Sequence, residues 1–502
     1  MYTNSVRKWS LYCLLLLFFF SPIELNAVNP IEYGLRYAKN GEERFWALYK
    51  AHVSASQTKE SVSYANVGDL DIEIPANAKS IPITWDTDFC GITITVKNSV
   101  KDFTLFSYSG QKRAIVIAKR DVDGKSFTNY DELRNGVKAL IIKDESPWIE
   151  NRKGFTYGAI RSDIRLLIDG NAQNDAIMPY DNTQSEPSCS FFVSDKRRKT
   201  IGNLKFARAL DCKYITRLFD IDASNNILIH DVVVLTPSEN NLMGDAVISV
   251  SNSTNVTFKD INIKGTYSHI EQYGYGISLN NVWNVKCYNI DAEAEWGVFC
   301  CNNVNYSFLK HCVLNRYDCH CYGRDIIAED CVFHDLSNQV SSVYGRISFK
   351  NCVFRNFIPI YLRDDYNSYV PFDVKFSKCK FYVTNKAHSL IYMGGLYLDA
   401  NNRPELVRQC WPNVEIRDIT ILSEEGIDEV SLFDVNKSIP PNYTVDYISR
   451  IDARKVRING NIKVFEISHQ PIKTKNKVIY SFKQRGSNAT VNRGKVIGLS
   501  EK

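Results

Sequence analysis

A short apolar pattern returns along the middle of this chain at intervals of 19 to 29 residues, and it restricts the fold more than any other feature. The first apolar residue of each copy is, in order, Val232, Ile261, Ile290, Cys312, Cys331, Cys352 and Cys379. A further copy begins at Asp418, and asparagines recur six residues before the first three copies, at Asn226, Asn255 and Asn284. Repeats of this length, made of short alternating strands with asparagine at turns, predict a solenoid of stacked coils.

The interior of such a solenoid accounts for most of the fourteen cysteines in the 502-residue sequence. Alternation along each strand points the recurring positions inward, so four cysteines continue a ladder of Val and Ile in which thiols act as small hydrophobes. A disulfide framework would suit a small, loop-rich secreted chain better. Neighbouring coils lie about 5 Å apart, so oxidation of some vertical pairs stays open.

The amino terminus has the layout of a secretory signal peptide over residues 1–27. Arg7 and Lys8 precede an apolar run over residues 11–20, and small residues end the segment at Ala27. The run is too short to span a bilayer comfortably, although a retained anchor is the alternative. We therefore expect a secreted or periplasmic protein without a transmembrane segment after signal removal, and attachment to the cell surface stays open.

Composition narrows the class of partner. Hydrophobic residues make up 44% of the chain, which excludes a disordered protein. The formal net charge is only +5, from 61 basic and 56 acidic residues, and this argues against a dedicated nucleic-acid binder. Such a charge would still tolerate an anionic ligand. The oligomeric state is not predicted.

Three segments are expected after the leader. Residues 28–66 form a helical cap, because residues 40–52 place apolar side chains on one helical face that can cover the open end of a solenoid. His52 lies on that face and is expected to pack there. Residues 67–435 form the parallel β-helix, and residues 436–502 form a β-rich cap at the other end. The loop-rich residues 169–188 are expected on the surface.

The segment over residues 315–325 holds the densest group of reactive side chains. Alternation along this strand allows two assignments of the side chains that point inward. Because an unpaired carboxylate in an apolar core costs several kcal/mol, we prefer the assignment, or strand phase, that buries the thiols. It turns Tyr317, Cys319 and Cys321 inward, and Arg316, Asp318 and His320 outward. Asp318 could then orient and charge the imidazole of His320 for acid–base catalysis. A structural salt-linked network is the alternative. A zinc site is disfavoured, since alternation separates Cys319 from His320.

Aromatic and basic residues in neighbouring coils are candidate ligand-binding residues. Aromatic rings offer flat apolar faces for a ligand ring, and arginine can clamp a carboxylate. Each could equally belong to a solvated loop. The candidates are Tyr273, Tyr275, Glu295, Trp296, Arg324, Tyr344, Arg346 and Arg363.

The leader, helical lid, asparagine-punctuated coils and interior ladder together resemble secreted bacterial proteins of the pectate-lyase-like superfamily, over roughly residues 65–430. Residues 315–320 are similar to an Arg-Phe-Asp-Ala-His turn in a subset of that superfamily. The resemblance implies an all-β, right-handed, single-stranded parallel β-helix with an N-terminal capping helix, and carbohydrate chemistry. It also shows departures: Gly244-Asp245-Ala246 lacks the second carboxylate of the hydrolases' Gly-Asp-Asp turn, and no Gly-His-Gly is present.

These observations favour lyase-type cleavage of an acidic, uronate-containing polysaccharide. His320 or a loop tyrosine would be the base, Asp318 would orient it, and Arg316 or Arg346 would neutralise the sugar carboxylate. A non-catalytic glycan-binding or adhesive β-helix, like the shafts of tail-spike-type proteins, is the main alternative. A polysaccharide hydrolase and a purely structural surface protein also stay open. No cofactor is predicted, and a calcium requirement is left open.

Overall fold

A computed structural model of the chain describes most of the sequence after residue 26. The described residues are 27–83, 85–144, 161–177, 186–194, 196–209, 212, 216–235, 246–264, 274–294, 296–341, 343–356, 358–363, 373–383, 389–393, 407–410, 412–435, 443–446, 450–468, 472–473, 478–484, 490–492 and 496–497. The predicted signal peptide, apart from Ala27, lies outside the described residues. Tyr273 and Glu295 also lie outside them. Within the described part, no helix is long and apolar enough to cross a membrane.

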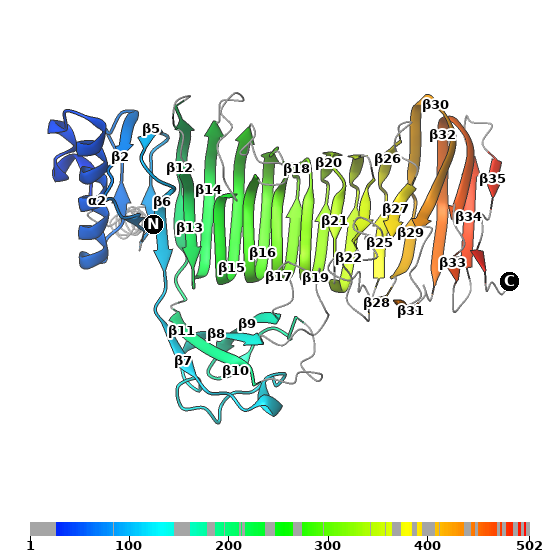
Figure 1. Cartoon of the computed structure of the whole chain (residues 1–502), viewed down its shortest axis with the longest axis horizontal. Helices are drawn as coiled ribbons and strands as arrows, with labels where there is room; N and C mark the ends of the chain where they lie inside the picture. Colours follow the sequence, from blue (N-terminus) through cyan, green and yellow to red (C-terminus); the bar gives the residue numbers. More distant parts are fainter. Residues whose placement is uncertain are drawn as a thin grey trace, which may run out of the picture.

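Parallel strands stack coil upon coil into a right-handed β-helix, which confirms the predicted fold class (Figure 1). Its central strands are β14 (Asn225–Leu235), β15 (Ala246–Lys264), β16 (Tyr275–Ala292), β17 (Gly297–Lys310), β19 (Tyr317–Glu329) and β22 (Val343–Lys350). Val232, Ile261 and Ile290 lie opposite one another in successive coils, as the repeat predicts.

The predicted interior ladder is present. Each of its seven residues is at most 1% exposed. Pairing of Val313 with Val332, and of Val353 with Lys380, aligns the preceding cysteines of these coils. The cysteines whose side chains the structure describes are free thiols, and most are buried. The thiols in the ladder therefore pack as small hydrophobes, as predicted.

Left-handed backbone at one corner of each coil precedes the ladder residue. The φ angles there lie between 50° and 56°, at Asp231, Asp260, Asn289, His311, Asp330, Asn351, Lys378 and Asp418. Asn and Asp tolerate this conformation better than most residues. A second corner carries stacked amides, in which Asn284 donates to Asn255 at 2.6 Å and Asn255 donates to Asn225 at 2.9 Å. These corners bend the chain within long strands such as β15 and β16, so that one strand runs along successive faces of the coil.

The N-terminal end of the stack is covered by α2 (Gly41–Thr58), which the Asn40 side chain caps (Figure 1). Phe45 and Leu48 are buried against the first coils. His52 is also buried, and its Nε2 atom lies 2.9 Å from the Tyr64 hydroxyl. Burial lowers the pKa of His52 to about 3, so it is a neutral packing residue, as expected.

An antiparallel insertion projects from the side of the solenoid (Figure 1). The repeat pattern of the sequence did not predict it. Its strands are β7 (Lys112–Ile115), β8 (Val137–Asp144), β9 (Arg161–Ile168), β10 (Asn171–Ala172) and β11 (Ser188–Ser194). They surround a small core of their own that includes Phe127, Leu140 and Phe191. Alternation of apolar residues is the same in parallel and antiparallel strands, so this feature did not distinguish the insertion from ordinary coils.

The stack continues beyond Val435. Strand β32 (Ile451–Ser468) pairs in parallel with β30 (Thr420–Val435), and β34 (Val478–Gln484) pairs with β32. These described strands extend the solenoid itself. The cap expected over residues 436–502 stays a prediction.

Candidate functional site

A β-bulge places His320 beside Asp318. Along the pair formed by β17 and β19, Cys300 lies opposite Asp318 and Cys301 opposite Cys319, but the next partner of Asn302 is Cys321. His320 is therefore the extra residue of the bulge, a feature that re-aims a side chain. The strand phase agrees with the prediction at Tyr317 and Cys319, which lie in the apolar core, and the side chain of Cys321 lies outside the described ones.

The carboxylate of Asp318 is the centre of a hydrogen-bond network. Its Oδ2 atom accepts from Nη2 of Arg316 at 2.5 Å, the Tyr275 hydroxyl at 2.9 Å and Nε2 of His320 at 3.1 Å. Its Oδ1 atom accepts from Nη1 of Arg363 at 3.5 Å. The structure thus joins the three predicted catalytic residues to two predicted binding residues from other coils. We call these five residues the Asp318 cluster.

The Asp318 cluster is more deeply covered than the outward strand phase suggested. Asp318 is 0% exposed, Arg316 is 3% exposed and the His320 side chain is 18% exposed. Burial is tolerable here because each charge has an opposite charge and hydrogen bonds nearby. Of the three predicted catalytic residues, His320 reaches solvent most.

Electrostatics set the protonation states of the pair. Burial raises the pKa of Asp318, but Arg316 and His320 outweigh burial and hold that pKa well below its usual range. Burial lowers the pKa of His320, but the Asp318 carboxylate outweighs burial and raises that pKa to about 10. At neutral pH the pair is therefore a carboxylate and an imidazolium. In this state His320 can donate a proton but cannot accept one.

Tyr275 links the two members of the pair. Its hydroxyl lies 2.9 Å from Asp318 and 3.2 Å from Nε2 of His320. Burial, followed by the charge of Asp318, raises the pKa of Tyr275 well above its usual value. Tyr275 is therefore a neutral hydrogen-bond donor at neutral pH.

Cys300 was not among the predicted site residues, yet it contacts His320. Its Sγ atom lies 3.6 Å from Nδ1 of His320, and the Asn302 amide donates to the same sulfur at 3.7 Å. Cys300 is partly exposed. The sequence held a signal for it, because an inward Cys301 implies an outward Cys300 level with Asp318. No group of three metal-binding side chains occurs in the described part of the chain.

The predicted aromatic residue Trp296 lies at the edge of the Asp318 cluster. The Arg316 guanidinium lies 4.9 Å from the centre of its ring, a cation–π distance. Gly297, with a φ of +140°, lets the Arg316 side chain pass, since a Cβ atom there would lie 2.9 Å from its Cδ atom. Trp296 therefore helps to hold Arg316 toward Asp318.

A row of outward side chains continues from Asp318 along the solenoid axis. Gln339 on β21 (Asn338–Val340) lies opposite Asp318, and Tyr361 on β24 (Ile360–Leu362) lies opposite Gln339. Tyr392 on β27 (Ser389–Met393) follows, with its ring centre 5.0 Å from that of Tyr361. We call Cys300, Asp318, Gln339, Tyr361 and Tyr392 the axial row.

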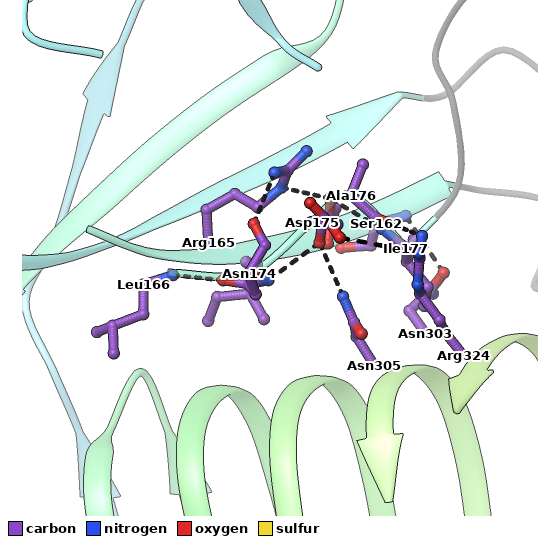
Figure 2. Close-up of polar contacts among 12 residues, drawn as sticks. Ser162, Arg165, Leu166, Asn174, Asp175, Ala176, Ile177, Asn303, Asn305 and Arg324 are labelled. Carbon is purple, nitrogen blue, oxygen red and sulfur yellow. Dashed lines mark hydrogen bonds and ion pairs between the residues drawn. The ribbon is translucent and has the colours of Figure 1, made fainter. Parts of the chain in front are cut away.

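Three predicted binding residues lie away from the Asp318 cluster. Arg324 faces the insertion, where it donates to the Ala176 carbonyl at 2.7 Å (Figure 2). Tyr344 lies opposite Arg324 on the next coil and is buried. Arg346 is exposed, and its backbone N–H donates to Asp325 at 3.1 Å. The structure does not join these three to the predicted catalytic residues.

A cleft of about 400 Å³ separates part of the insertion from the solenoid. Its lining includes Lys125, Asp175, Trp283 and Lys286 as well as Arg324. Beside it, the Asn305 amide donates to the Asp175 carbonyl at 3.0 Å (Figure 2). Polar contacts of this kind dock the insertion on the coils.

Comparisons with known proteins bear on the fold alone. No protein-family model and no curated protein matches the sequence. Among solved structures, the tailspike protein gp49 from Pseudomonas phage LKA1 has a TM-score of 0.52 at 13% identity, covering 91% of this chain and 83% of its own. The gp54 tailspike of Acinetobacter baumannii bacteriophage AP22, solved with a capsular saccharide, has a TM-score of 0.48 at 11% identity, covering 89% and 77%. The similarity to gp49 supports the parallel β-helix.

Proposed function

We propose that this protein is an exported β-helix protein that binds an acidic polysaccharide along the axial row. One observation carries the proposal: among the described residues of the Asp318 cluster, a single carboxylate faces the three cations Arg316, His320 and Arg363. The Asp318 cluster therefore concentrates cationic side chains beside the axial row. A partly exposed imidazolium in such surroundings favours an anionic group, such as a uronate carboxylate.

The shape of the axial row favours a polymer over a small ligand. Successive coils lie about 4.8 Å apart, so the row presents side chains at a regular spacing along the solenoid. In the coils that follow Asp318, Tyr392 supplies a partly exposed aromatic ring, which packs beside the 6% exposed ring of Tyr361. Aromatic rings beside cations suit sugars that carry carboxylates.

Lyase-type cleavage is a second candidate, and the position of Tyr275 favours it. The Tyr275 hydroxyl contacts both Asp318 and His320, so a proton can be relayed within the Asp318 cluster. Elimination needs a cation at the sugar carboxylate and a proton donor at the leaving oxygen, and the His320 imidazolium suits either role. The base would come from another residue. Tyr273, a candidate from the sequence, lies outside the described residues.

The test compares polysaccharides that differ in charge. Binding of the purified protein to polygalacturonate and to a neutral dextran of similar length is measured by calorimetry, and unsaturated uronate products are followed by ultraviolet absorbance. We expect binding to polygalacturonate that weakens with salt, and a loss of about tenfold in His320→Gln. The control is His334→Gln, which removes a histidine paired with the exposed Asp335 on the surface.

Equal affinity for the neutral polymer, or unchanged affinity in His320→Gln, contradicts the binding proposal. Release of unsaturated products that stops in His320→Gln supports cleavage. Binding without any product supports recognition alone.

A further inference from the structure

Cys300, His320 and Asp318 form a continuous line of contacts on two adjacent coils. The imidazole lies between the other two, with Nδ1 3.6 Å from the Cys300 sulfur and Nε2 3.1 Å from Oδ2 of Asp318. One ring orientation therefore serves both contacts. A thiol, an imidazole and an orienting carboxylate in this order are the parts of an activated cysteine nucleophile.

Separate parts of the fold hold each member of this line. Cys300 is directed outward because Cys301 packs in the core, and the parallel register places it opposite Asp318. The bulge directs the imidazole, and Arg316 fixes Asp318 from the other side. The geometry is thus supported by the core of the solenoid, and does not depend on an exposed loop.

Cys300 differs from the other cysteines that the structure describes. Most of those are buried, and burial raises the pKa of thiols such as Cys301 and Cys287. Cys90 is exposed, but its sulfur contacts only the Ser63 hydroxyl and the Asp88 carbonyl among the described contacts, each at 3.7 Å. Cys300 combines partial exposure with an adjacent imidazolium, the environment typical of reactive cysteines.

A hydrogen-bond donor also lies beside the sulfur. The side-chain amide of Asn302 is 3.7 Å from Cys300 and is partly exposed. An amide next to a nucleophile can donate to the oxyanion that forms when a carbonyl is attacked. The cations of the Asp318 cluster favour the same negative charge.

We propose that Cys300 is a nucleophile that removes an acyl group from an ester, with His320 as its proton-transfer partner and Asp318 as a positioning residue. The Cys300 thiolate forms a bond to the ester carbonyl carbon, the carbon–oxygen bond breaks, and the leaving alkoxide takes a proton from His320. The neutral His320 then takes a proton from water, whose oxygen attacks the thioester. The carbon–sulfur bond breaks, which releases the carboxylic acid and restores the thiolate and imidazolium.

The class of substrate is a carboxylic ester, represented in the test by an acetyl ester. That the acyl group sits on a sugar hydroxyl rests on the proposed function, because the axial row is the surface beside Cys300. The thiol chemistry itself rests only on the three side chains. The two claims can therefore be tested apart.

The first experiment measures the reactivity of Cys300 in the intact protein. The protein is treated with iodoacetamide at pH 6, and alkylation of each cysteine is resolved by peptide mass spectrometry. We expect Cys300 to react at least about tenfold faster than Cys90 in the same molecule, and to lose that advantage in His320→Gln. Equal rates at the two cysteines, or fast alkylation that survives His320→Gln, would overturn the proposal.

The second experiment follows acyl transfer from 4-nitrophenyl acetate. We expect a burst of nitrophenol and an acetyl group on Cys300, both lost in Cys300→Ser and kept in Cys90→Ser. Turnover that persists in Cys300→Ser overturns the proposal. Binding to unacetylated polygalacturonate is measured in parallel: its absence contradicts the proposed function and leaves the test of the thiol unaffected.

Discussion

His320 and Asp318 lie two residues apart on one strand and share a hydrogen bond of 3.1 Å, because the bulge in β19 turns the imidazole toward the carboxylate. Contacts of this kind also form without a bulge, since Asp163 and Arg165 are two apart in β9 and their charged atoms lie 2.8 Å from each other. The bulge at His320 instead sets the direction from which the imidazole meets the carboxylate. Its effect is to bury an ion pair beside the solvent-facing Cys300.

Stability should fall as pH rises through the range in which His320 loses its proton. The pKa of His320 is about 10 in the folded protein against 6.5 for an ordinary histidine. The folded state thus keeps a proton that the unfolded state releases. This stabilisation is complete below about pH 6.5 and disappears toward pH 10, a loss on the order of 2 to 4 kcal/mol.

Urea unfolding between pH 6 and 10 measures this dependence. Because other groups also titrate in that range, the relevant quantity is the difference between the wild-type protein and His320→Gln. The difference should shrink as pH rises. A difference that is constant from pH 6 to 10 contradicts the assigned protonation state.

Replacing Asp318 should be costly. In Asp318→Asn, the buried guanidinium of Arg316 loses the carboxylate that it pairs with at 2.5 Å, and Arg363 loses its contact with Oδ1; together these losses cost about 3 kcal/mol or more of unfolding free energy. Asp335→Asn is the matched control, since Asp335 pairs with His334 at 2.6 Å but is 66% exposed, and it should cost less than about 1 kcal/mol. Denaturation midpoints compare the two, and equal losses contradict a structural role for the buried network.

The sequence alone predicted those features of the fold whose physical cause lies within a few neighbouring residues. The inward ladder at Cys352 and the left-handed corner at Asn351 follow from alternation and from the tolerance of asparagine for positive φ. The phase of β19 followed from the cost of burying an unpaired carboxylate, which correctly placed Cys319 in the core.

The contacts that complete the Asp318 cluster could not be predicted in the same way. Tyr275 lies 43 residues before Asp318 and Arg363 lies 45 residues after it. Their meeting depends on the length of every intervening coil and on the bulge at His320, and neither is encoded in a local pattern. The structure therefore brings the three predicted catalytic residues together, while Arg324, Tyr344 and Arg346 lie elsewhere, and the catalytic role of the three stays a prediction.

The cysteine ladder should tolerate an aliphatic residue and reject a charge. Cys352 is 0% exposed, and the equivalent position of an earlier coil is Val232. Cys352→Val should change the free energy of unfolding by less than about 1.5 kcal/mol, whereas Cys352→Asp should cost several kcal/mol.

Because the cysteines of the ladder are free thiols, a reducing agent should leave the thermal midpoint of unfolding unchanged. A midpoint that falls on reduction would show that some pairs are oxidised in solution.

The asparagine corners should reveal a conformational cost that glycine relieves. Asn255 has a φ of 54° and takes part in two amide hydrogen bonds. Asn255→Ala should lose about 2 to 4 kcal/mol, and Asn255→Gly should recover about 1 kcal/mol of it. At Thr257, which lies two residues further along β15, the order should reverse, with Ala better than Gly. The same order at both positions contradicts the role assigned to the left-handed corner.

Docking of the insertion should depend on Arg324. Its guanidinium donates to the Ala176 carbonyl at 2.7 Å, and the adjacent Asn305 amide donates to the Asp175 carbonyl (Figure 2). Removing one of these contacts in Arg324→Ala should speed amide hydrogen exchange in residues 161–177 several-fold, because that segment then opens more often. Exchange in the coils should not change, since their core does not include Arg324.

Arg346→Ala, at an exposed arginine on the next coil, is the control and should leave the insertion protected from exchange. If both variants raise exchange equally, or if the coils lose protection in Arg324→Ala, then Arg324 acts on the solenoid and not on the docking contact.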